Sequence, residues 1–186
     1  ITRTFALGPV TEEEKKHYTW VLKAHIALAT AVFLEGTTDG NLDMVCRGKI
    51  QKHGLDYRCG TGHGVGMFGG VHEGPQSIRP KNHVILRSGM TVTDEPGIYE
   101  EGKHGIRTEN LLLVTDAMEN EYGHFLRFEI LTCFPIDTAP LLPELLTREE
   151  IAWLNEYHSR VYRALSPLLS GEARKWLRRK TLPLVV

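Results

Sequence analysis

The sequence predicts an α+β domain in which helical segments flank a central sheet. Apolar residues recur at helical spacing from Thr11 to Leu34, which predicts a long amphipathic helix. Three runs rich in β-branched and aromatic residues follow between residues 90 and 134, separated by glycine-bearing turns, as expected for strands. A further helical pattern begins after Thr147, so the predicted order is helices, sheet, helices.

Length and composition indicate a folded domain and exclude several functional classes. The 186 residues suffice to bury a core, and 41% hydrophobic against 24% charged residues excludes intrinsic disorder. The net charge of −1 predicts no nucleic-acid or membrane partner. The longest nearly apolar stretch, Ile26–Leu34, is far shorter than the roughly 20 residues that cross a bilayer. Three cysteines without a CxxC pair predict reduced thiols and an intracellular protein.

The N-terminal part is predicted to contain a strand and a long helix. Ile1–Phe5 is β-branched and aromatic, which predicts an opening strand. Thr11 and Glu14 form a capping-box pattern, so a helix is expected to begin there and to extend to about Leu34. Gly36 is the expected C-terminal cap of this helix.

A glycine-rich segment follows a second predicted helix. This helix covers about Leu42–Lys52 and is expected to end at Gly54. Eight of the 18 glycines in the chain lie between residues 54 and 74. Because glycine lacks a Cβ atom, this density predicts that the backbone there approaches another group unusually closely.

The remaining elements are three strands and two helices. The strand signals cover Met90–Glu95, Gly105–Thr115 and Phe125–Phe134. After a link that contains three prolines, Thr147–Glu150 forms another capping-box pattern, which predicts a helix to about Ala164. A last short helix is expected to begin after Ser170.

The most informative pair of residues is Glu95 and Glu109. Gly102 lies midway between them, and Tyr99–His104 resembles a hairpin loop, so a symmetric hairpin would place the two carboxylates opposite each other. Opposed carboxylates, with Cβ atoms roughly 4.5–5.5 Å apart, repel unless a proton or cation lies between them. Pro96 is a possible site of a bulge that shifts this register. The alternative interpretation is two solvated surface glutamates.

Two histidines lie in the glycine-rich segment. His63 stands within Gly-Thr-Gly-His-Gly-Val-Gly at residues 60–66, where the glycines leave room for an imidazole to reach a ligand. The spacing matches neither a dinucleotide-binding nor a phosphate-binding loop. His72, nine residues later, is a second candidate for the same pocket. Cys59 is a candidate nucleophile, but no activating pattern accompanies it, and a buried inert thiol is the preferred interpretation.

Four ordered motifs carry a resemblance to a known family. They are GTGHGVG at 60–66, VHEGP at 71–75, TDEPGIY at 93–99 and GIRTEN at 105–110. In this order they resemble the pita-bread metallopeptidases of the prolidase and methionine aminopeptidase superfamily, and within it the Xaa-Pro aminopeptidases, or aminopeptidases P. The resemblance implies an antiparallel sheet covered by helices. Residues 1–140 are then expected to form a partial pita-bread domain, and residues 141–186 a helical extension that packs on it.

The resemblance also implies roles for individual residues. The matching metal ligands are one histidine and two glutamates: His63, Glu95 and Glu109. His72 matches a histidine that hydrogen-bonds the substrate and the tetrahedral intermediate, and Tyr99 and Arg107 match residues that orient the carboxylate ligands. The catalytic residues are therefore expected to be His72, Glu95, Arg107 and Tyr99.

The family uses two aspartate ligands that this sequence does not contain. The second of them immediately precedes the family segment that matches Ile1–Thr4, and the first lies further upstream. The chain is therefore expected to be an N-terminally truncated fragment of a longer enzyme. On this view the isolated chain binds metal weakly or not at all and is inactive alone.

The ligand types predict the metal, and the resemblance predicts the reaction. Carboxylates with one imidazole and no thiolate suit divalent ions, with Mn²⁺ favoured and Co²⁺ or Zn²⁺ as alternatives, and the resemblance implies two of them. Such ions lower the pKa of a bridging water and polarise the scissile carbonyl. The resemblance implies hydrolysis of the first peptide bond in proline-containing peptides, and a homodimer.

Three alternatives remain open at this point. A prolidase cleaves only dipeptides and is the nearest enzymatic alternative. A creatinase-like hydrolase uses the same fold without metal, and some pita-bread proteins are non-catalytic binding modules. Retention of His63, Glu95 and Glu109 favours the metallopeptidase over a binding module, whereas the metal content of the full-length protein would separate it from a creatinase-like hydrolase.

Overall fold

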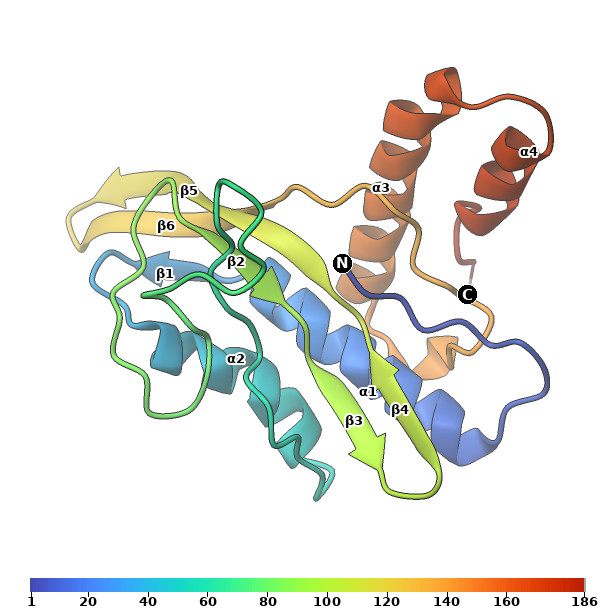
Figure 1. Ribbon diagram of the computed structural model, residues 1–186, viewed down its shortest axis with the longest axis horizontal. Coiled ribbons are helices and arrows are strands. Elements are labelled where there is room, and N and C mark those ends of the chain that lie inside the picture. Colours follow the sequence, from blue (N-terminus) through green and yellow to red (C-terminus); the bar gives the residue numbers. More distant parts are fainter. Residues whose placement is uncertain (186) are drawn as a thin grey trace. The chain divides into compact units, whose positions relative to one another are not determined.

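The computed structural model describes residues 1–185 (Figure 1). Its elements are α1 (Glu12–Ala29), β1 (Val32–Leu34), α2 (Asp39–Gln51), β2 (Thr91–Asp94), β3 (Gly97–Glu100), β4 (His104–Arg107), β5 (Asn110–Asn120), β6 (Gly123–Ile130), α3 (Arg148–Leu165) and α4 (Gly171–Lys180), with short 3₁₀ turns at Pro143–Leu145 and Ser166–Leu168. The chain forms two compact units, and α1 contributes to both of them. The order of elements confirms the predicted α+β class.

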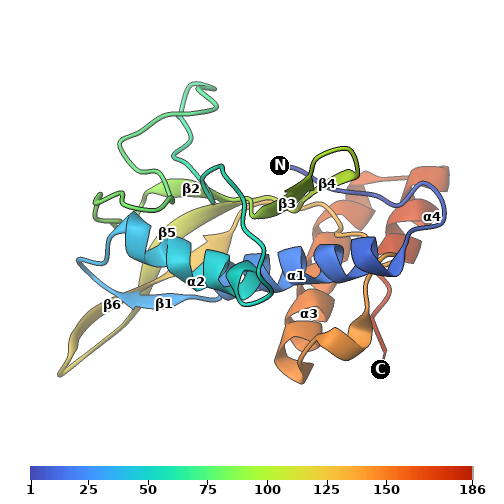
Figure 2. The same ribbon diagram turned by 90° about the horizontal axis from the view of Figure 1, so that it is seen from below.

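The larger unit contains Ile1–Thr2 and Trp20–Thr132. Its four-stranded sheet has the order β1-β6-β5-β2 with antiparallel neighbours, and β3 and β4 form a separate antiparallel pair. The second half of α1 and all of α2 lie along one face of the sheet (Figure 2). Fully buried apolar side chains from these helices and strands form its core: Val21, Leu22, Leu28, Leu42, Ile50, Val92, Leu112 and Val114.

The first helix is shorter than its sequence pattern predicts. The expected end near Leu34 is wrong, because α1 ends at Ala29 and Val32–Leu34 is the strand β1. The β1 side chains alternate between exposed and buried, and the strand pairs with β6, so tertiary pairing overrides the helical pattern. Gly36, with φ of +94°, lies in the turn after β1 and does not cap the helix.

Helix starts follow the sequence signals more closely. Thr11 and Glu14 exchange capping-box hydrogen bonds of 2.6 and 3.2 Å, as predicted. The same arrangement is present at Thr147, which caps α3. The second helix begins at Asp39, earlier than predicted, because the Thr38 side chain caps it. Gly54, with φ of +76°, follows the end of α2 as expected.

Three strands and one hairpin loop differ from the prediction. The opening strand is reduced to one bridge between Thr2 and Glu109, because residues 3–19 belong to the other unit. The run predicted at Gly105–Thr115 is divided into β4 and β5. The hairpin loop is shorter than Tyr99–His104, since β3 extends to Glu100 and β4 begins at His104. The third run forms β6, which begins at Gly123.

The glycine-rich segment lies against β2, as its composition predicts. A Cβ atom on Gly62 would stand 1.8 Å from the Thr93 carbonyl oxygen, and one on Gly64 would stand 2.0 Å from the Glu73 carbonyl oxygen. Backbone bonds join the two segments, with Thr93 N donating to His63 O at 2.8 Å. Only glycine permits this approach, which brings His63 to the edge of the sheet.

The smaller unit contains Arg3–Thr19 and the chain from Cys133 onward, including α3 and α4. The Arg3 guanidinium donates to the carbonyl oxygens of Phe134 and Pro135 and to the Tyr157 hydroxyl. Trp153 stacks on Tyr157 with ring centroids 5.5 Å apart. These contacts attach the N-terminal segment to α3 through one cation with several acceptors.

A buried histidine couples the stability of this chain to pH. His158 on α3 has no exposed surface, and its Nε2 accepts a 3.1 Å hydrogen bond from the backbone N–H of Ile136. Burial lowers the pKa of His158 from 6.5 to about 4. The folded protein therefore keeps this imidazole neutral where an unfolded chain would protonate it.

We predict that the free energy of unfolding decreases as pH falls from about 6.5 to about 4, because the unfolded state binds the additional proton in that window. The contribution of His158 is about 3 kcal/mol. His158→Gln keeps an acceptor for Ile136 N but cannot titrate. Urea unfolding at several pH values should therefore show a smaller decrease for this variant than for the wild type. Parallel pH curves for the two proteins would contradict the prediction.

Candidate metal centre

Glu95 and Glu109 face each other across one continuous register. The β2–β5 ladder ends at the pair Asp94↔Asn110, and the β3–β4 ladder resumes in the same register beyond it. Pro96 interrupts the hydrogen bonding but does not shift the pairing. The opposition predicted from the hairpin symmetry is therefore present. Glu109 is buried and Glu95 is partly buried, so the interpretation of two solvated surface glutamates does not fit.

His63 is oriented by bonds to its own loop and to β2. Its backbone N–H donates to Thr93 Oγ1 at 3.0 Å, and its ring Nδ1 lies 2.9 Å from the Gly64 carbonyl oxygen. Because a carbonyl only accepts, Nδ1 is the donor in this contact, and Nε2 is the ring nitrogen that faces the carboxylates. Nε2 lies 3.1 Å from Oε1 of Glu95.

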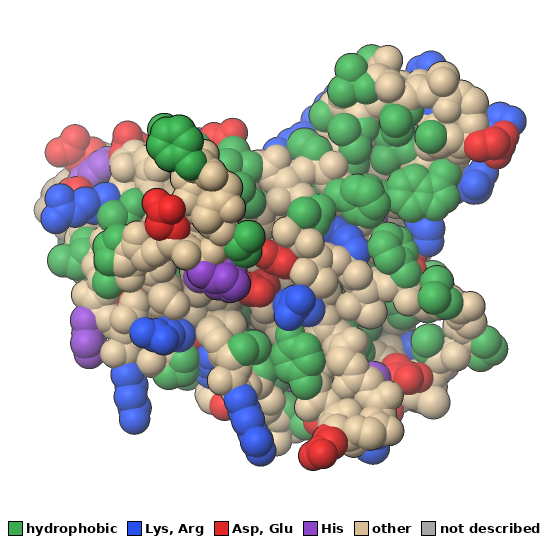
Figure 3. Space-filling view, in the orientation of Figure 1, with side chains coloured by type: hydrophobic (Ala, Val, Ile, Leu, Met, Phe, Trp, Pro, Cys, Tyr) green, Lys and Arg blue, Asp and Glu red, His purple; other side chains and the backbone are tan. Residues whose placement is uncertain are grey.

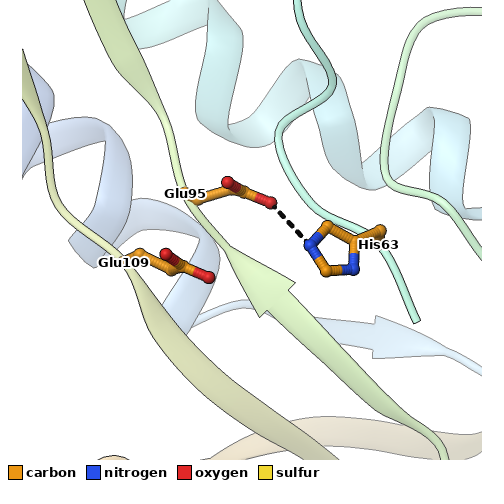
Figure 4. A group of neighbouring side chains, drawn as sticks. All are labelled: His63, Glu95 and Glu109. Carbon is orange, nitrogen blue, oxygen red and sulfur yellow. Dashed lines mark ion pairs between the residues drawn. The ribbon is translucent and has the colours of Figure 1, made fainter. Parts of the chain in front are cut away.

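The three side chains converge on one point. One ligand atom from each of His63, Glu95 and Glu109 lies within 4.8 Å of the other two, and Figure 4 shows the three groups directed at a common space. An imidazole lone pair and two carboxylates offer electron pairs and no proton donor among themselves. This donor set fits a hard or borderline divalent cation.

Two threonines hold the carboxylates, and sequence reasoning missed both. Thr93 Oγ1 donates to Oε1 of Glu95 at 2.8 Å, and Thr2 Oγ1 donates to Oε2 of Glu109 at 2.5 Å. Thr93 lies two residues before Glu95, so the two-residue period of a strand could have identified it. No comparable signal marks Thr2, which is 107 residues away from Glu109. The amino group of Ile1 also lies 3.5 Å from Oε1 of Glu109.

The other predicted site residues lie around this group. The rings of His72 and His63 have centroids 4.0 Å apart. Arg107 Nε lies 4.0 Å from Oε2 of Glu95, and its Nη1 donates to the Tyr99 hydroxyl at 3.3 Å. All six predicted site residues are thus connected in space.

A cleft adjoins the site and contains an unexpected thiol. The cleft has a volume of about 640 Å³ and is lined by residues 56–59, 99–101 and 107. Cys59 is exposed there, so the expectation that it is buried was wrong. Partial burial raises the pKa of the Tyr99 phenol on the same wall.

The negative charge of the site affects a residue behind it. Burial raises the pKa of Asp94, and the nearby charges of Glu95 and Glu109 raise it further, while His25 acts in the opposite direction. The unfavourable field of two glutamates is the electrostatic condition that a bound cation relieves.

Sequence comparisons identify relatives along the whole chain. Residues 1–116 match the metallopeptidase family M24, and residues 124–184 match the C-terminal region of peptidase M24. A probable Xaa-Pro aminopeptidase P of Coprinopsis cinerea is 45% identical over 99% of this chain and 31% of its own length. Aminopeptidase P1 of Arabidopsis thaliana is 47% identical over the full chain and 30% of its own length.

Solved structures show the same fold. The X-prolyl aminopeptidase of Caenorhabditis elegans, described as a cytosolic enzyme with a di-nuclear active site, matches with a TM-score of 0.89 and 39% identity over 98% of this chain and 30% of that one. A Xaa-Pro dipeptidase of Bacillus anthracis matches with a TM-score of 0.60 and 30% identity over 73% of this chain and 35% of that one. The fold is therefore the predicted pita-bread fold. This chain spans about a third of the length of these relatives, and it belongs to metallopeptidase family M24.

Proposed function

We propose that this chain forms part of the active site of an Xaa-Pro aminopeptidase that hydrolyses the N-terminal Xaa-Pro bond of peptides with two divalent ions. The observation that carries the proposal is the convergence of His63, Glu95 and Glu109 within 4.8 Å. Family membership and relatives with this activity over the whole chain support it. The di-nuclear site described for the C. elegans relative supports the number of ions.

The donor set determines which ion suits the site. One imidazole and two carboxylates favour Mn²⁺, with Co²⁺ or Zn²⁺ as alternatives. His63 would hold the ions through Nε2, and Glu95 and Glu109 would hold them through their carboxylates. Two bound ions would supply a water of lowered pKa and would polarise the scissile carbonyl.

The protein residues perform the positioning and the proton transfer. Glu95 is proposed to take a proton from the attacking water and to deliver it to the leaving proline nitrogen. His72, beside His63, is placed to donate a hydrogen bond to the developing oxyanion. Arg107 and Tyr99 orient the carboxylates and contribute to the wall of the adjoining cleft.

Two comparisons favour an aminopeptidase over a prolidase. The C. elegans aminopeptidase matches nearly the whole chain with a TM-score of 0.89, and the curated relatives of C. cinerea and A. thaliana that are named as aminopeptidases P also match 99% of it or more. The C-terminal M24 region, which includes α3 and α4, also matches residues 124–184. A non-catalytic binding module would have no need for the converging ligands.

We also propose a cytoplasmic location and a homodimer. The C. elegans relative is described as cytosolic, which supports the location. Along residues 1–185, every helix is too short or too polar to cross a bilayer. The dimer follows from the resemblance to the family.

The chain alone is predicted to bind Mn²⁺ weakly. Within residues 1–185, the only group of three or more His, Cys, Asp or Glu side chains that could hold a metal ion is His63, Glu95 and Glu109. Three side chains cannot complete the coordination of two ions. Isothermal titration with Mn²⁺ should therefore give a dissociation constant weaker than micromolar. An activity assay of the chain alone should show no hydrolysis of an Xaa-Pro-Xaa peptide. Binding of two Mn²⁺ ions at micromolar or tighter affinity would contradict this prediction.

The intact gene product is predicted to cleave a short Xaa-Pro-Xaa peptide, to lose activity with a chelator and to regain it with Mn²⁺. Glu109→Gln should lower kcat/KM by about 100-fold or more, because the loss of a ligand should cost at least as much as the loss of a residue that orients one. Glu129→Gln is the matched control, since Glu129 is exposed on β6. Cleavage of dipeptides only would indicate a prolidase. Activity that a chelator does not affect would indicate a creatinase-like enzyme, and the absence of hydrolysis would indicate a binding module.

Thr2→Val is predicted to destabilise this chain by roughly 1–3 kcal/mol, because the buried Glu109 carboxylate loses a charge-assisted hydrogen bond. The Thr2 hydroxyl also accepts a bond from Arg107 Nε at 3.3 Å. Thr2→Ser keeps the hydroxyl and should retain the wild-type stability. Urea unfolding at pH 7 measures both variants, and equal stability of the valine and serine variants would show that the bond is unimportant.

A further inference from the structure

A buried polar cluster lies behind the metal ligands and has no part in the proposed chemistry. It consists of His25 on α1, Asp94 at the end of β2 and Asn110 at the start of β5. None of the three side chains has exposed surface. A fully buried polar cluster is costly to form, and such clusters often specify geometry instead of adding stability.

His25 contacts both strands at once. Its Nδ1 lies 3.0 Å from Oδ2 of Asp94, and its Nε2 lies 3.0 Å from Nδ2 of Asn110. Since an amide nitrogen only donates, Nε2 is the acceptor from Asn110, whereas Nδ1 meets the Asp94 carboxylate in a close contact that lacks hydrogen-bond geometry. The imidazole therefore joins β2 and β5 through the side chains of one cross-strand pair.

This pair is the neighbour of the ligand pair. Asp94 directly precedes Glu95, and Asn110 directly follows Glu109, so side-chain alternation puts the cluster on the opposite face from the metal ligands. The N–H groups of the ligand pair point away from each other, as in any non-hydrogen-bonded pair of an antiparallel ladder, and the strand pairing that ends at Asp94↔Asn110 resumes only at Gly97↔Arg107. The Glu95 N–H donates to Thr61 O at 2.7 Å, and the Glu109 N–H donates to Thr2 O at 3.0 Å.

The ladder is thus open where the ligands need a defined spacing. A divalent cation site tolerates errors of only a few tenths of an ångström in ligand position. The last closed pair before the opening is Asp94↔Asn110, and its side chains are held by one ring. The distance between the two backbone segments at Glu95 and Glu109 is therefore set by the neighbouring pair Asp94↔Asn110.

We propose that His25, Asp94 and Asn110 form a buried clamp that positions Glu95 and Glu109 for divalent-cation binding. The identification of these glutamates as ligands rests on the proposed function. The clamp itself is a property of the metal-free chain. Its members are positioning residues, because they contact neither ion nor substrate but act through the backbone of the ligand pair.

The test compares amide hydrogen exchange in the metal-free chain, measured by NMR. Asn110→Leu preserves side-chain size but removes the bond to His25. The amides of Glu95 and Glu109 should then exchange at least tenfold faster. The exchange rate of the Val114 amide on β5, which donates to Met90 O, should be unchanged. An equal change at all three amides, or none at the ligand pair, would overturn the clamp. Should Asn110→Leu fail to fold, Asn110→Ala provides the same comparison.

A conservative variant separates positioning from simple packing. Asp94→Asn retains a polar oxygen beside His25 Nδ1 and should keep the exchange rates of Glu95 and Glu109 near those of the wild type. Asp94→Leu removes this polar contact and should accelerate both. If Asp94→Asn accelerates them as much as Asp94→Leu, the clamp is refuted. Because these measurements contain no metal, failure of the clamp and failure of the proposed metal site give distinct results.

Discussion

The opposition of two carboxylates is the constraint on which the site depends. One carboxylate oxygen of Glu95 and one of Glu109 lie within 4.8 Å of each other in the two segments that connect the paired strands, and at an effective dielectric constant near 20 such charges repel by about 3 kcal/mol. The continuous register across Pro96 maintains this opposition. Arg107 beside Glu95 offsets part of the repulsion, and the proposed metal ions would offset the rest.

The surrounding residues make this arrangement possible from the accessible face. The glycine-rich segment can approach β2 only because Gly62 has no side chain, and this approach brings His63 beside Glu95. Thr93 then connects the two, since its hydroxyl accepts from the His63 N–H and donates to the Glu95 carboxylate. The glycine content of this segment therefore permits its close approach to β2, and that approach orients His63 and Glu95 as ligands.

The buried face supports the same pair by different means. There the connection is made by His25, which bridges Asp94 and Asn110 behind the open part of the ladder. Donors on the accessible face orient the carboxylate oxygens, whereas the buried cluster acts on the backbone that carries them. Such a division suits the proposed metal centre, because metal ligands need supporting contacts that keep them in fixed relative positions.

The sequence alone determined features that depend on near neighbours or on a fixed period. The capping boxes at Thr11 and Thr147 and the opposition of Glu95 and Glu109 are of this kind, because each follows from spacing along a few residues of chain. The tertiary structure alone decided that Val32–Leu34 pairs with β6, that Thr2 bonds to Glu109 and that His25 joins β2 to β5. These contacts join residues about 70 to 107 positions apart, and at such separations local propensity and periodicity carry no information about the partner.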